Sequence, residues 1–257
     1  RGAVWVERAQ VGAAADLRAL DGAGSHRISC EASQSRPPHL RHIMNPDVLP
    51  GTDLTPAEAK ELQTLLRKRL RLVSPPEDGV RLIAGADVSI RRGRDMGHAA
   101  LVVLEKDTLR PVDQAHASVP VRFPYVPGFL SFRELPPLAA AWEKLRVRPD
   151  LILFDGHGLA HPRRFGLACH GGLLFDAPAI GVAKSVLVGE HETPGEKKGS
   201  AAPLSHEGEE VGMALRTRTG VSPVFVSVGH LMDLATAVTI VMKVSPCYRI
   251  PEPIRRA

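Results

Sequence analysis

Hydrophobic residues recur along this chain at two different spacings, which predict both helices and strands. The helical spacing is clearest after residue 55, and the positions that follow it are Leu62, Leu65, Leu66 and Leu70. Before them, Thr55, Pro56 and Glu58 match a helix start, with a capping threonine, a proline in the first turn and a glutamate that completes a capping box. We therefore predict a helix that begins near residue 56.

Short apolar runs between turn residues predict strands, which we place at 81–90, 99–104, 112–119, 151–154, 179–182 and 223–228. The first three follow one another as a meander, whereas the later ones alternate with predicted helices at 138–145 and 233–243. This order predicts an α/β fold with a mixed central sheet flanked by helices. Residues 193–210 are expected to form a surface excursion, and residues 251–257 a polar tail.

The first 50 residues show no such pattern. Residues 1–50 mix small, charged and proline residues without sustained periodicity, and the first methionine is Met44. This composition favours a flexible N-terminal extension that contributes little to the core. We expect one domain over residues 51–257, which is long enough to bury a sizeable core.

Composition narrows the class of protein. Hydrophobic residues make up 44% and charged residues 24% of the chain, which is typical of a globular domain and excludes a disordered, collagen-like or coiled-coil chain. The net charge of +5 suits a polyanionic partner, because lysine and arginine displace the counterions of phosphates. A merely basic soluble protein has the same charge, so this observation alone leaves the partner open.

Cysteine usage and hydropathy bear on the compartment. Cys30, Cys169 and Cys247 are far apart and form no C-x-x-C pair, which argues against a disulfide framework and a zinc knuckle. No apolar run reaches about 18 residues, so no membrane span is expected. The first residues also lack the apolar centre of a secretory signal. We expect a cytoplasmic protein without membrane association.

Two aspartates lie in or directly after predicted strands. Asp87 stands among apolar strand residues, and Asp155 follows the apolar run LILF. Ligands of open α/β sheets collect at the carboxyl ends of strands, and two carboxylates on neighbouring strands can share one Mg²⁺. This pairing predicts metal-assisted phosphoester chemistry. For either aspartate alone, capping of a loop at a strand end is an equally good explanation.

Three further residues accompany the aspartates. The two prolines that follow Glu134 favour a helix start after it, which leaves this carboxylate free to face the aspartates; a capping box with Ser131 is the alternative. Lys184 and His230 each follow an apolar strand. A lysine there can hold a phosphate or the attacking water, and a histidine can bind metal or move a proton. A single histidine is more often structural.

A proline-rich loop at residues 123–128 holds Tyr125 beside Pro127. Prolines stiffen the loop, so the tyrosine can stack on a base or wedge between bases; packing onto the core is the competing explanation. His161 and Arg163 lie in the run HPRR, for which nucleic-acid contact and a solvated loop are both reasonable. His157 and His161 have a spacing that superficially resembles that of zinc ligands, but no cysteine or further close pair completes the set.

Several motifs in order resemble the Endonuclease V family, over roughly residues 53–257. They are GADVS at 85–89, PYVPGFLSFRE at 124–134, FDGHGLAHPRRFGLACH at 154–170, IGVAKS at 180–185, SVGH at 227–230 and YRIPEP at 248–253. The resemblance implies a ribonuclease H-like fold and a Mg²⁺-dependent endonuclease, with Mn²⁺ as a substitute. It further implies DNA repair by hydrolysis of the second phosphodiester bond 3′ to deoxyinosine, which leaves a 5′-phosphate.

The resemblance also implies roles for individual residues. Asp87 and Asp155 would bind the metal and Glu134 would complete the acidic site, with His230 near the metal and Lys184 near the scissile phosphate. Tyr125 is similar to the family's strand-separating wedge. The positions that resemble the family's pocket for a flipped hypoxanthine are Gly128, Leu130, Gly156 and Gly181. After Gly229 and His230 the family usually has arginine, and Leu231 in its place would weaken phosphate contact or loop anchoring.

Two other hypotheses stay open at this point. A different ribonuclease H-like nuclease, such as a junction resolvase, would share the acidic residues but not the wedge or the base pocket. A protein that binds inosine-containing nucleic acid without cutting it would not need the metal. Inosine-containing RNA is an alternative target to DNA, because a contact to a 2′-hydroxyl leaves no motif. We favour DNA as the substrate and expect a monomer.

Overall fold

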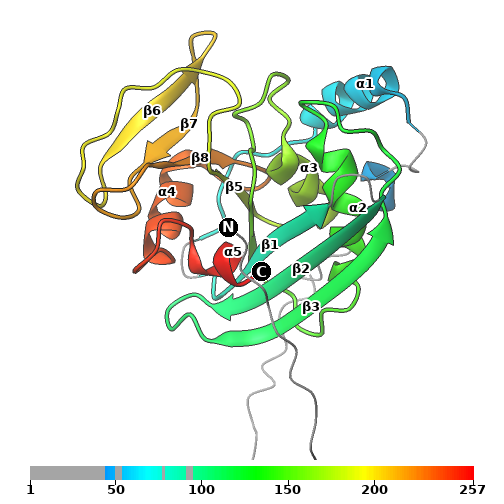
Figure 1. Ribbon diagram of the computed structural model, residues 1–257, viewed down its shortest axis with the longest axis horizontal. Helices are drawn as coiled ribbons and strands as arrows, with labels where there is room; N and C mark the ends of the chain where they lie inside the picture. The colour runs from blue at the N-terminus through cyan, green and yellow to red at the C-terminus, as the bar shows by residue number, and fades with distance from the viewer. Residues whose placement is uncertain (1–43, 50–53, 77–78, 91–94) are drawn as a thin grey trace, which may run out of the picture. The chain divides into compact units, whose positions relative to one another are not determined.

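The computed structural model describes residues 44–49, 54–76, 79–90 and 95–257, which all belong to one compact unit spanning residues 41–257. Its centre is an eight-stranded sheet with the order β3-β2-β1-β4-β5-β8-β7-β6 (Figure 1). The strands are β1 (Leu82–Ile90), β2 (Met96–Glu105), β3 (Pro111–Pro120), β4 (Leu151–Phe154), β5 (Ala179–Ala183), β6 (Ala201–His206), β7 (Glu209–Leu215) and β8 (Val224–Val228). The helical segments are the 3-10 helix η2 (Pro46–Val48), α1 (Pro56–Arg67), α2 (Leu130–Trp142), α3 (Leu167–Leu174), α4 (Leu234–Lys243) and α5 (Glu252–Arg256).

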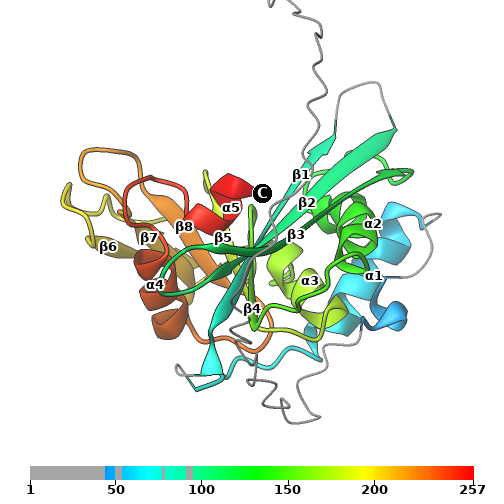
Figure 2. The same ribbon diagram turned by 90° about the horizontal axis from the view of Figure 1, so that it is seen from below.

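The sheet is mixed, as predicted. β4 runs parallel to both β1 and β5, and all other neighbouring strands are antiparallel. Helices cover both faces (Figure 2), because side chains of a strand alternate between the faces. In β1, Ile83 belongs to a buried cluster with residues of α4 and α5, whereas Ala84 belongs to one with residues of α1, α2 and α3. No helix within the described ranges is both long and apolar enough to span a membrane.

The first helix forms as its sequence predicts. The Thr55 side chain accepts a hydrogen bond from the Glu58 backbone, and the Glu58 carboxylate accepts one from the Thr55 backbone. This capping box satisfies two backbone donors that the first turn would otherwise leave without partners. Leu66 and Gln63 lie on the buried side of α1, whereas Leu65 is exposed.

The predicted start of the second helix is wrong. α2 begins at Leu130 and contains Glu134 and the two prolines inside it, whereas we predicted a start after Glu134. A proline inside a helix removes a backbone hydrogen bond. Burial of apolar side chains offsets this cost, since Leu135, Leu138 and other residues on one side of α2 are fully buried. Ser131 is not the N-cap of α2, so the capping-box alternative also fails.

Three further elements differ from the sequence-based prediction. α3 was not predicted, and the expected surface excursion at 193–210 contains β6 and the first residues of β7, which pair as a hairpin. The expected polar tail contains α5, which packs so tightly on β1 that a Cβ atom at Gly85 would lie 2.0 Å from the backbone of Pro253. Gly85 therefore leaves space for this close approach of two backbones.

The boundary of the domain lies earlier than residue 51. The Asn45 backbone donates a 2.7 Å hydrogen bond to the carbonyl oxygen of Leu174, and the Val48 side chain is fully buried in the core. Residues 44–49 thus belong to the packed domain. The rest of the predicted N-terminal extension, residues 1–43, lies outside the described residues.

Candidate active site

Asp87 and Asp155 lie next to each other on neighbouring parallel strands. Ala86 of β1 pairs with Phe154 of β4, and the Asp155 backbone donates a 3.4 Å hydrogen bond to the Ala86 carbonyl oxygen. The two aspartates are the next residues in this register, so their side chains emerge on the same face of the sheet. The structure therefore brings together the two carboxylates that the strand pattern singled out.

Glu134 joins these aspartates from α2. Burial raises the pKa of Glu134 to about 8, and the negative charges of Asp87 and Asp155 act in the same direction. Lys184, directly after β5, forms an ion pair with the Asp155 carboxylate through its Nζ atom. The nearby cations Arg133 and Lys184 oppose the rise in the pKa of Glu134 without cancelling it. The result is an acidic centre of three carboxylates with one lysine.

The acidic centre suits a hard cation. Mg²⁺ prefers one or two carboxylates and takes its other ligands from water and substrate oxygens, so Asp87 and Asp155 fit such a site. Over the described ranges, no group of three or more histidine, cysteine, aspartate or glutamate side chains has the closeness of a complete metal cage.

His230 does not lie at the acidic centre. Its carbonyl oxygen accepts a 2.9 Å hydrogen bond from Ala179 at the start of β5, whereas Lys184 follows the end of that strand. Five strand residues separate the two positions by about 16 Å at about 3.3 Å per residue. β8 runs antiparallel to β5, so its carboxyl end lies at the opposite edge of the sheet. The strand-end argument fails for His230 for this reason.

The surroundings of His230 are those of a structural residue. Its Nδ1 atom accepts a 3.3 Å hydrogen bond from the Arg71 backbone, and the ring is buried. Burial, together with the charge of Arg71, lowers the pKa of His230 to about 4. Leu231 lies at the same edge, with a positive φ of 52° and a 2.6 Å hydrogen bond from its backbone to the Arg71 carbonyl oxygen. The Leu231 substitution therefore lies far from the acidic centre.

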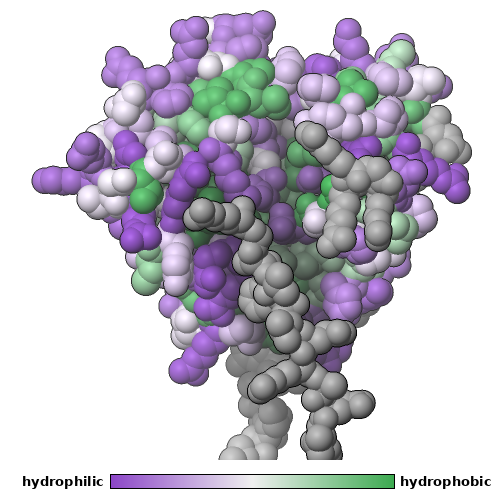
Figure 3. Space-filling view, viewed as in Figure 1, coloured by the Kyte–Doolittle hydropathy of each residue, from purple (hydrophilic) through white to green (hydrophobic). Residues whose placement is uncertain are grey.

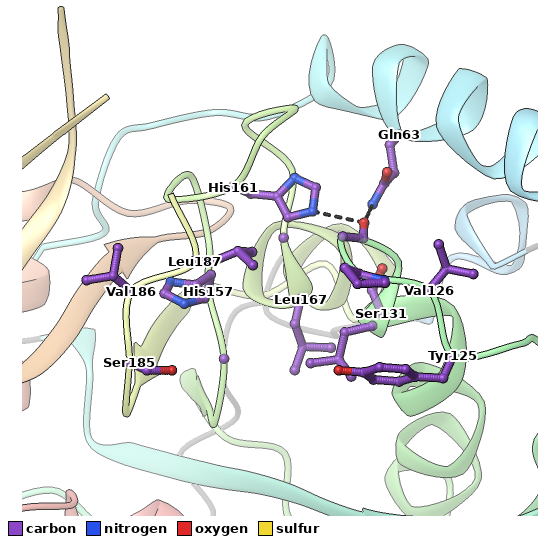
Figure 4. Close-up of a pocket in the computed structure, with 15 residues that line it drawn as sticks. Gln63, Tyr125, Val126, Ser131, His157, His161, Leu167, Ser185, Val186 and Leu187 are labelled. Carbon is purple, nitrogen blue, oxygen red and sulfur yellow. Dashed lines mark hydrogen bonds between the residues drawn. The ribbon is translucent and has the colours of Figure 1, made fainter. Parts of the chain in front are cut away.

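The structure contains a pocket of about 300 Å³, whose wall residues are drawn in Figure 4. Gly156, the residue after Asp155, forms part of its wall. The wall is built from α1, the loop before α2 and the start of α2, the segment after β4 and the segment after β5. Its residues are Gln63, Tyr125, Val126, Pro127, Gly128, Leu130, Ser131, Gly156, His157, His161, Gly166, Leu167, Ser185, Val186 and Leu187.

Six of the residues that we assigned to nucleic-acid contact line this pocket, namely Tyr125, Pro127, Gly128, Leu130, Gly156 and His161. Gly181 lies behind the wall, because a Cβ atom there would lie 2.5 Å from the carbonyl oxygen of Gly156. Arg163 is also outside the wall, and its guanidinium binds the Gly128 carbonyl oxygen and Gln63. Gly181 and Arg163 thus support the pocket and do not line it.

The remaining wall residues were not predicted. Val186 and Leu187 are exposed apolar residues directly after Lys184 and Ser185. The face of the molecule in Figure 3 is mostly hydrophilic, with a few apolar patches. His157 is largely buried, which lowers its pKa to about 4. Its Nδ1 atom has no hydrogen-bond partner within the described part of the chain. The sequence offers two signals for these residues. Val186 and Leu187 are an apolar pair in a loop, and His157 lies two positions after the candidate metal ligand Asp155.

Comparisons with known proteins identify the relatives of this chain. The family model described as Endonuclease V matches residues 64–257. Endonuclease V of Myxococcus xanthus is 62% identical over 205 residues, which cover 80% of this chain and 87% of that protein. The crystal structure of Endonuclease V from Streptomyces avermitilis is 50% identical with a TM-score of 0.77, and the match covers 80% of this chain and 91% of that one.

A structure with nucleic acid also matches. Endonuclease V of Ciona intestinalis, crystallised with a 23mer DNA containing an inosine followed by a ribo-adenosine, is 29% identical with a TM-score of 0.71. This match covers 79% of this chain and 95% of that one. The sheet therefore has the ribonuclease H-like fold of these structures, as the motifs implied. The family model and the close relatives together show that this chain belongs to the Endonuclease V family of nucleases.

Proposed function

We propose that this protein is a metal-dependent endonuclease that binds a deaminated purine in the pocket and cuts the same strand on the 3′ side, at the second phosphodiester bond. The proposal depends on the closeness of the acidic centre to the pocket. Asp155 of the acidic centre and Gly156 of the pocket wall are consecutive residues. The Ciona intestinalis relative bound to inosine-containing DNA supports the choice of base. DNA is the proposed main substrate, and inosine-containing RNA the second.

The pocket has the form needed to hold an extruded base. Its volume of about 300 Å³ is at the lower end of the range of ligand pockets, which is about 300–1,000 Å³. Gly128 and Gly156 let the backbone approach the base closely, and Leu167 offers an apolar surface. Extruding a base costs a few kcal/mol, and less when the base is mispaired, which favours damaged sites.

Tyr125 is placed to assist the extrusion. It lies on the rim of the pocket and 75% of its surface is exposed, so it does not pack on the core. Figure 4 shows its ring beside the pocket, at the end of the loop that precedes α2. An exposed aromatic ring on a stiff loop can fill the gap that a displaced base leaves in a duplex. We assign Tyr125 the role of a wedge.

The chemistry that we propose is in-line hydrolysis of a phosphodiester. Bound Mg²⁺, or Mn²⁺ in its place, would supply an activated water and neutralise charge on the phosphate. Asp87 and Asp155 hold the cation. Lys184 binds Asp155 and is free to turn its ammonium towards a phosphate oxygen when substrate arrives. Glu134, whose pKa is raised to about 8, holds a proton near neutral pH and can exchange it with the reacting groups.

A nicking assay tests this proposal. The substrate is a labelled duplex with one deoxyinosine, incubated with the protein in Mg²⁺ and in EDTA, with an undamaged duplex and a four-way junction as controls. We expect one cut on the 3′ side of deoxyinosine in Mg²⁺ only. Tight binding without nicking under both conditions would support an inosine-binding protein, and cutting of the junction would support a resolvase. The same assay on inosine-containing RNA ranks the two polymers.

A further inference from the structure

Three side chains donate hydrogen bonds to one backbone oxygen, the carbonyl of Gly128. Figure 4 shows two of these bonds, from Gln63 and His161. The distances to that oxygen are 3.1 Å from Gln63 Nε2, 2.9 Å from His161 Nε2 and 2.6 Å from Arg163 Nη2. Gln63 belongs to α1, and the other two residues belong to the segment after β4. A carbonyl oxygen has two lone pairs, so three donors hold it from several directions.

The donors also hold one another in place. The Oε1 atom of Gln63 accepts a 2.6 Å hydrogen bond from Arg163 Nε, and its Nε2 atom also donates to the Phe165 carbonyl oxygen over 3.3 Å. The Arg163 backbone donates to His161 Nδ1 over 3.1 Å, so His161 carries its proton on Nε2. Both ring nitrogens of His161 are therefore used, which leaves neither for a metal or for proton transfer.

The carbonyl that they hold belongs to a tight turn. The Phe129 backbone donates a 3.1 Å hydrogen bond to Val126, and Gly128 has a φ of +82° directly after Pro127. Proline followed by glycine with positive φ is the pattern of a type II turn. A Cβ atom at Gly128 would lie 2.8 Å from Arg163 Nη2, so a larger residue would both strain the turn and displace this donor.

This turn connects the exposed Tyr125 to the protein. Phe123 and Phe129, on either side of the loop, are buried with Phe132 in one aromatic cluster. Arg163 lies over the Phe129 ring at 4.3 Å from its centroid. The loop is thus fixed on both sides of Tyr125, while the tyrosine itself remains exposed. A side chain that separates bases needs such support, because its loop must resist the displacement that the duplex imposes.

We propose that Gln63, His161 and Arg163 form a clamp on the Gly128 carbonyl that positions the Tyr125 loop for opening a nucleic-acid duplex. Gln63 is the informative member. The residue is only 1% exposed on the buried side of α1, a place normally filled by an apolar side chain. Within the described residues its hydrogen bonds go to members of the clamp, to Gly128 and to Phe165, and none goes to an acidic residue. Gln63 is therefore a positioning residue, and this inference rests on the proposed function.

The test compares duplex with single-stranded substrates. Gln63→Met keeps the volume of the side chain and removes all its hydrogen bonds. Gln63→Glu keeps an oxygen that can accept from Arg163 but removes the N–H groups that donate to Gly128 and Phe165. We expect both variants to nick a deoxyinosine duplex about tenfold more slowly and a deoxyinosine single strand less than about threefold more slowly. Tyr125→Ala should give the same ratio. The double variant Gln63→Met with Tyr125→Ala should nick the duplex no more slowly than Tyr125→Ala alone.

Asp113→Asn is the matched control for loss of stability. Asp113 is a buried acceptor of hydrogen bonds from the Arg146 and Val147 backbones, remote in sequence from the pocket segments. It should slow nicking of duplex and single strand equally. Equal losses on both substrates for Gln63→Met, or a double variant in which the two losses multiply, would overturn the clamp and leave Gln63 as a residue of the scaffold only.

A second measurement keeps the clamp testable if the proposed nuclease activity fails. The probe is a duplex with 2-aminopurine next to deoxyinosine, whose fluorescence rises when the base unstacks, titrated with protein in EDTA. Wild-type protein should raise the signal, and Gln63→Met should raise it at least about threefold less at the same bound fraction. An equal rise for both proteins contradicts the clamp, whatever the nicking assay shows.

Discussion

The acidic centre and the pocket beside it differ in the interactions that shape them, which are charge repulsion in the first and hydrogen bonds and packing in the second. The acidic centre gathers Asp87, Glu134 and Asp155, with Lys184 as an ion-pair partner, and the mutual repulsion of these carboxylates contributes to the raised pKa of Glu134. The pocket instead combines glycine turns and apolar side chains, supported by neutral groups such as Gln63 that are satisfied by hydrogen bonds. One region is strained by the repulsion of like charges, and the other is held by hydrogen bonds and packing.

This difference predicts that substitutions in the two regions affect activity and stability differently. Carboxylates that repel one another destabilise the folded protein until a cation binds, so their removal should cost activity and not stability. The pocket gains its shape from buried hydrogen bonds and packing. Substitution of a pocket residue should therefore reduce selectivity between substrates, and substitution of a buried one should also reduce the stability of the fold. The following variants test whether the two regions behave in these opposite ways.

The largest effect is expected at the two aspartates. Asp87→Asn and Asp155→Asn should each reduce nicking by at least about 10³-fold, because they remove charge from the site that holds the cation. Binding of deoxyinosine DNA in EDTA should change less than about threefold, since the pocket is untouched. Gel-shift and nicking assays on the same samples measure both quantities. Nicking at the wild-type rate in either variant would contradict the metal role.

Glu134→Gln should lose activity and gain stability. We expect nicking to fall by roughly 10²-fold, the lower range for loss of a general acid or base. The pKa of Glu134 is about 8 in the folded protein against an ordinary value of 4.5, so between these values the folded state holds the additional proton. Stability therefore decreases as pH rises from about 4.5 to about 8. The glutamine side chain of the variant cannot ionise, so the substitution removes this decrease.

Thermal unfolding in EDTA measures the stability part. At pH 8 the Glu134→Gln variant should unfold at a higher temperature than the wild type, and at pH 5 the two should be closer. Mg²⁺ at pH 8 should raise the unfolding temperature of the wild type more than that of the variant. A variant that is less stable than the wild type at pH 8 would show that Glu134 is not under electrostatic strain.

Tyr125→Ala should have an intermediate effect that depends on the substrate. Loss of one stacking ring is worth about 1–3 kcal/mol, so nicking of duplex DNA should fall about tenfold or more. Single-stranded DNA needs no wedge and should be cut at nearly the wild-type rate. The unfolding temperature should stay unchanged, because most of the tyrosine is exposed. Equal losses on the two substrates would contradict the role of a wedge.

The sequence predicts the acidic centre better than the pocket, and the reason is physical. A carboxylate at the end of an apolar strand is a local signal, and parallel neighbours such as β1 and β4 bring two such ends together. Gln63 carries no such signal, because its partners lie 65 and 100 residues away in the chain. The pocket consists largely of contacts of this kind. Loop composition singled out Tyr125 and His161, whereas Gly128 and Leu130 followed only from resemblance to a family.

The same reasoning explains the elements that the pattern misplaced. The helix start before Glu134 depends on burial of Leu135 and Leu138 against the sheet, which outweighs the local preference of the two prolines. The β6 and β7 hairpin has short apolar stretches among polar and small residues, so its periodicity is weak. Strand direction is also absent from the local pattern. Because β8 runs antiparallel to β5, His230 follows a strand as Lys184 does but lies at the opposite edge of the sheet.

The smallest effect on activity is expected at that residue, His230. His230→Ala removes the buried ring that accepts a hydrogen bond from the Arg71 backbone, and it keeps the Cβ atom that lies against Gly172 of α3. We expect a loss of about 1–3 kcal/mol in the free energy of unfolding, as for other buried groups that lose a partner. Below the temperature at which it unfolds, the variant should nick deoxyinosine DNA within about threefold of the wild type, because about 16 Å of sheet separates it from Lys184. Urea unfolding and nicking rates at low temperature measure the two effects. If the variant is stable but inactive, His230 takes part in catalysis. That result would contradict its assignment as a structural residue, which depends on its position at the opposite edge of the sheet from Lys184.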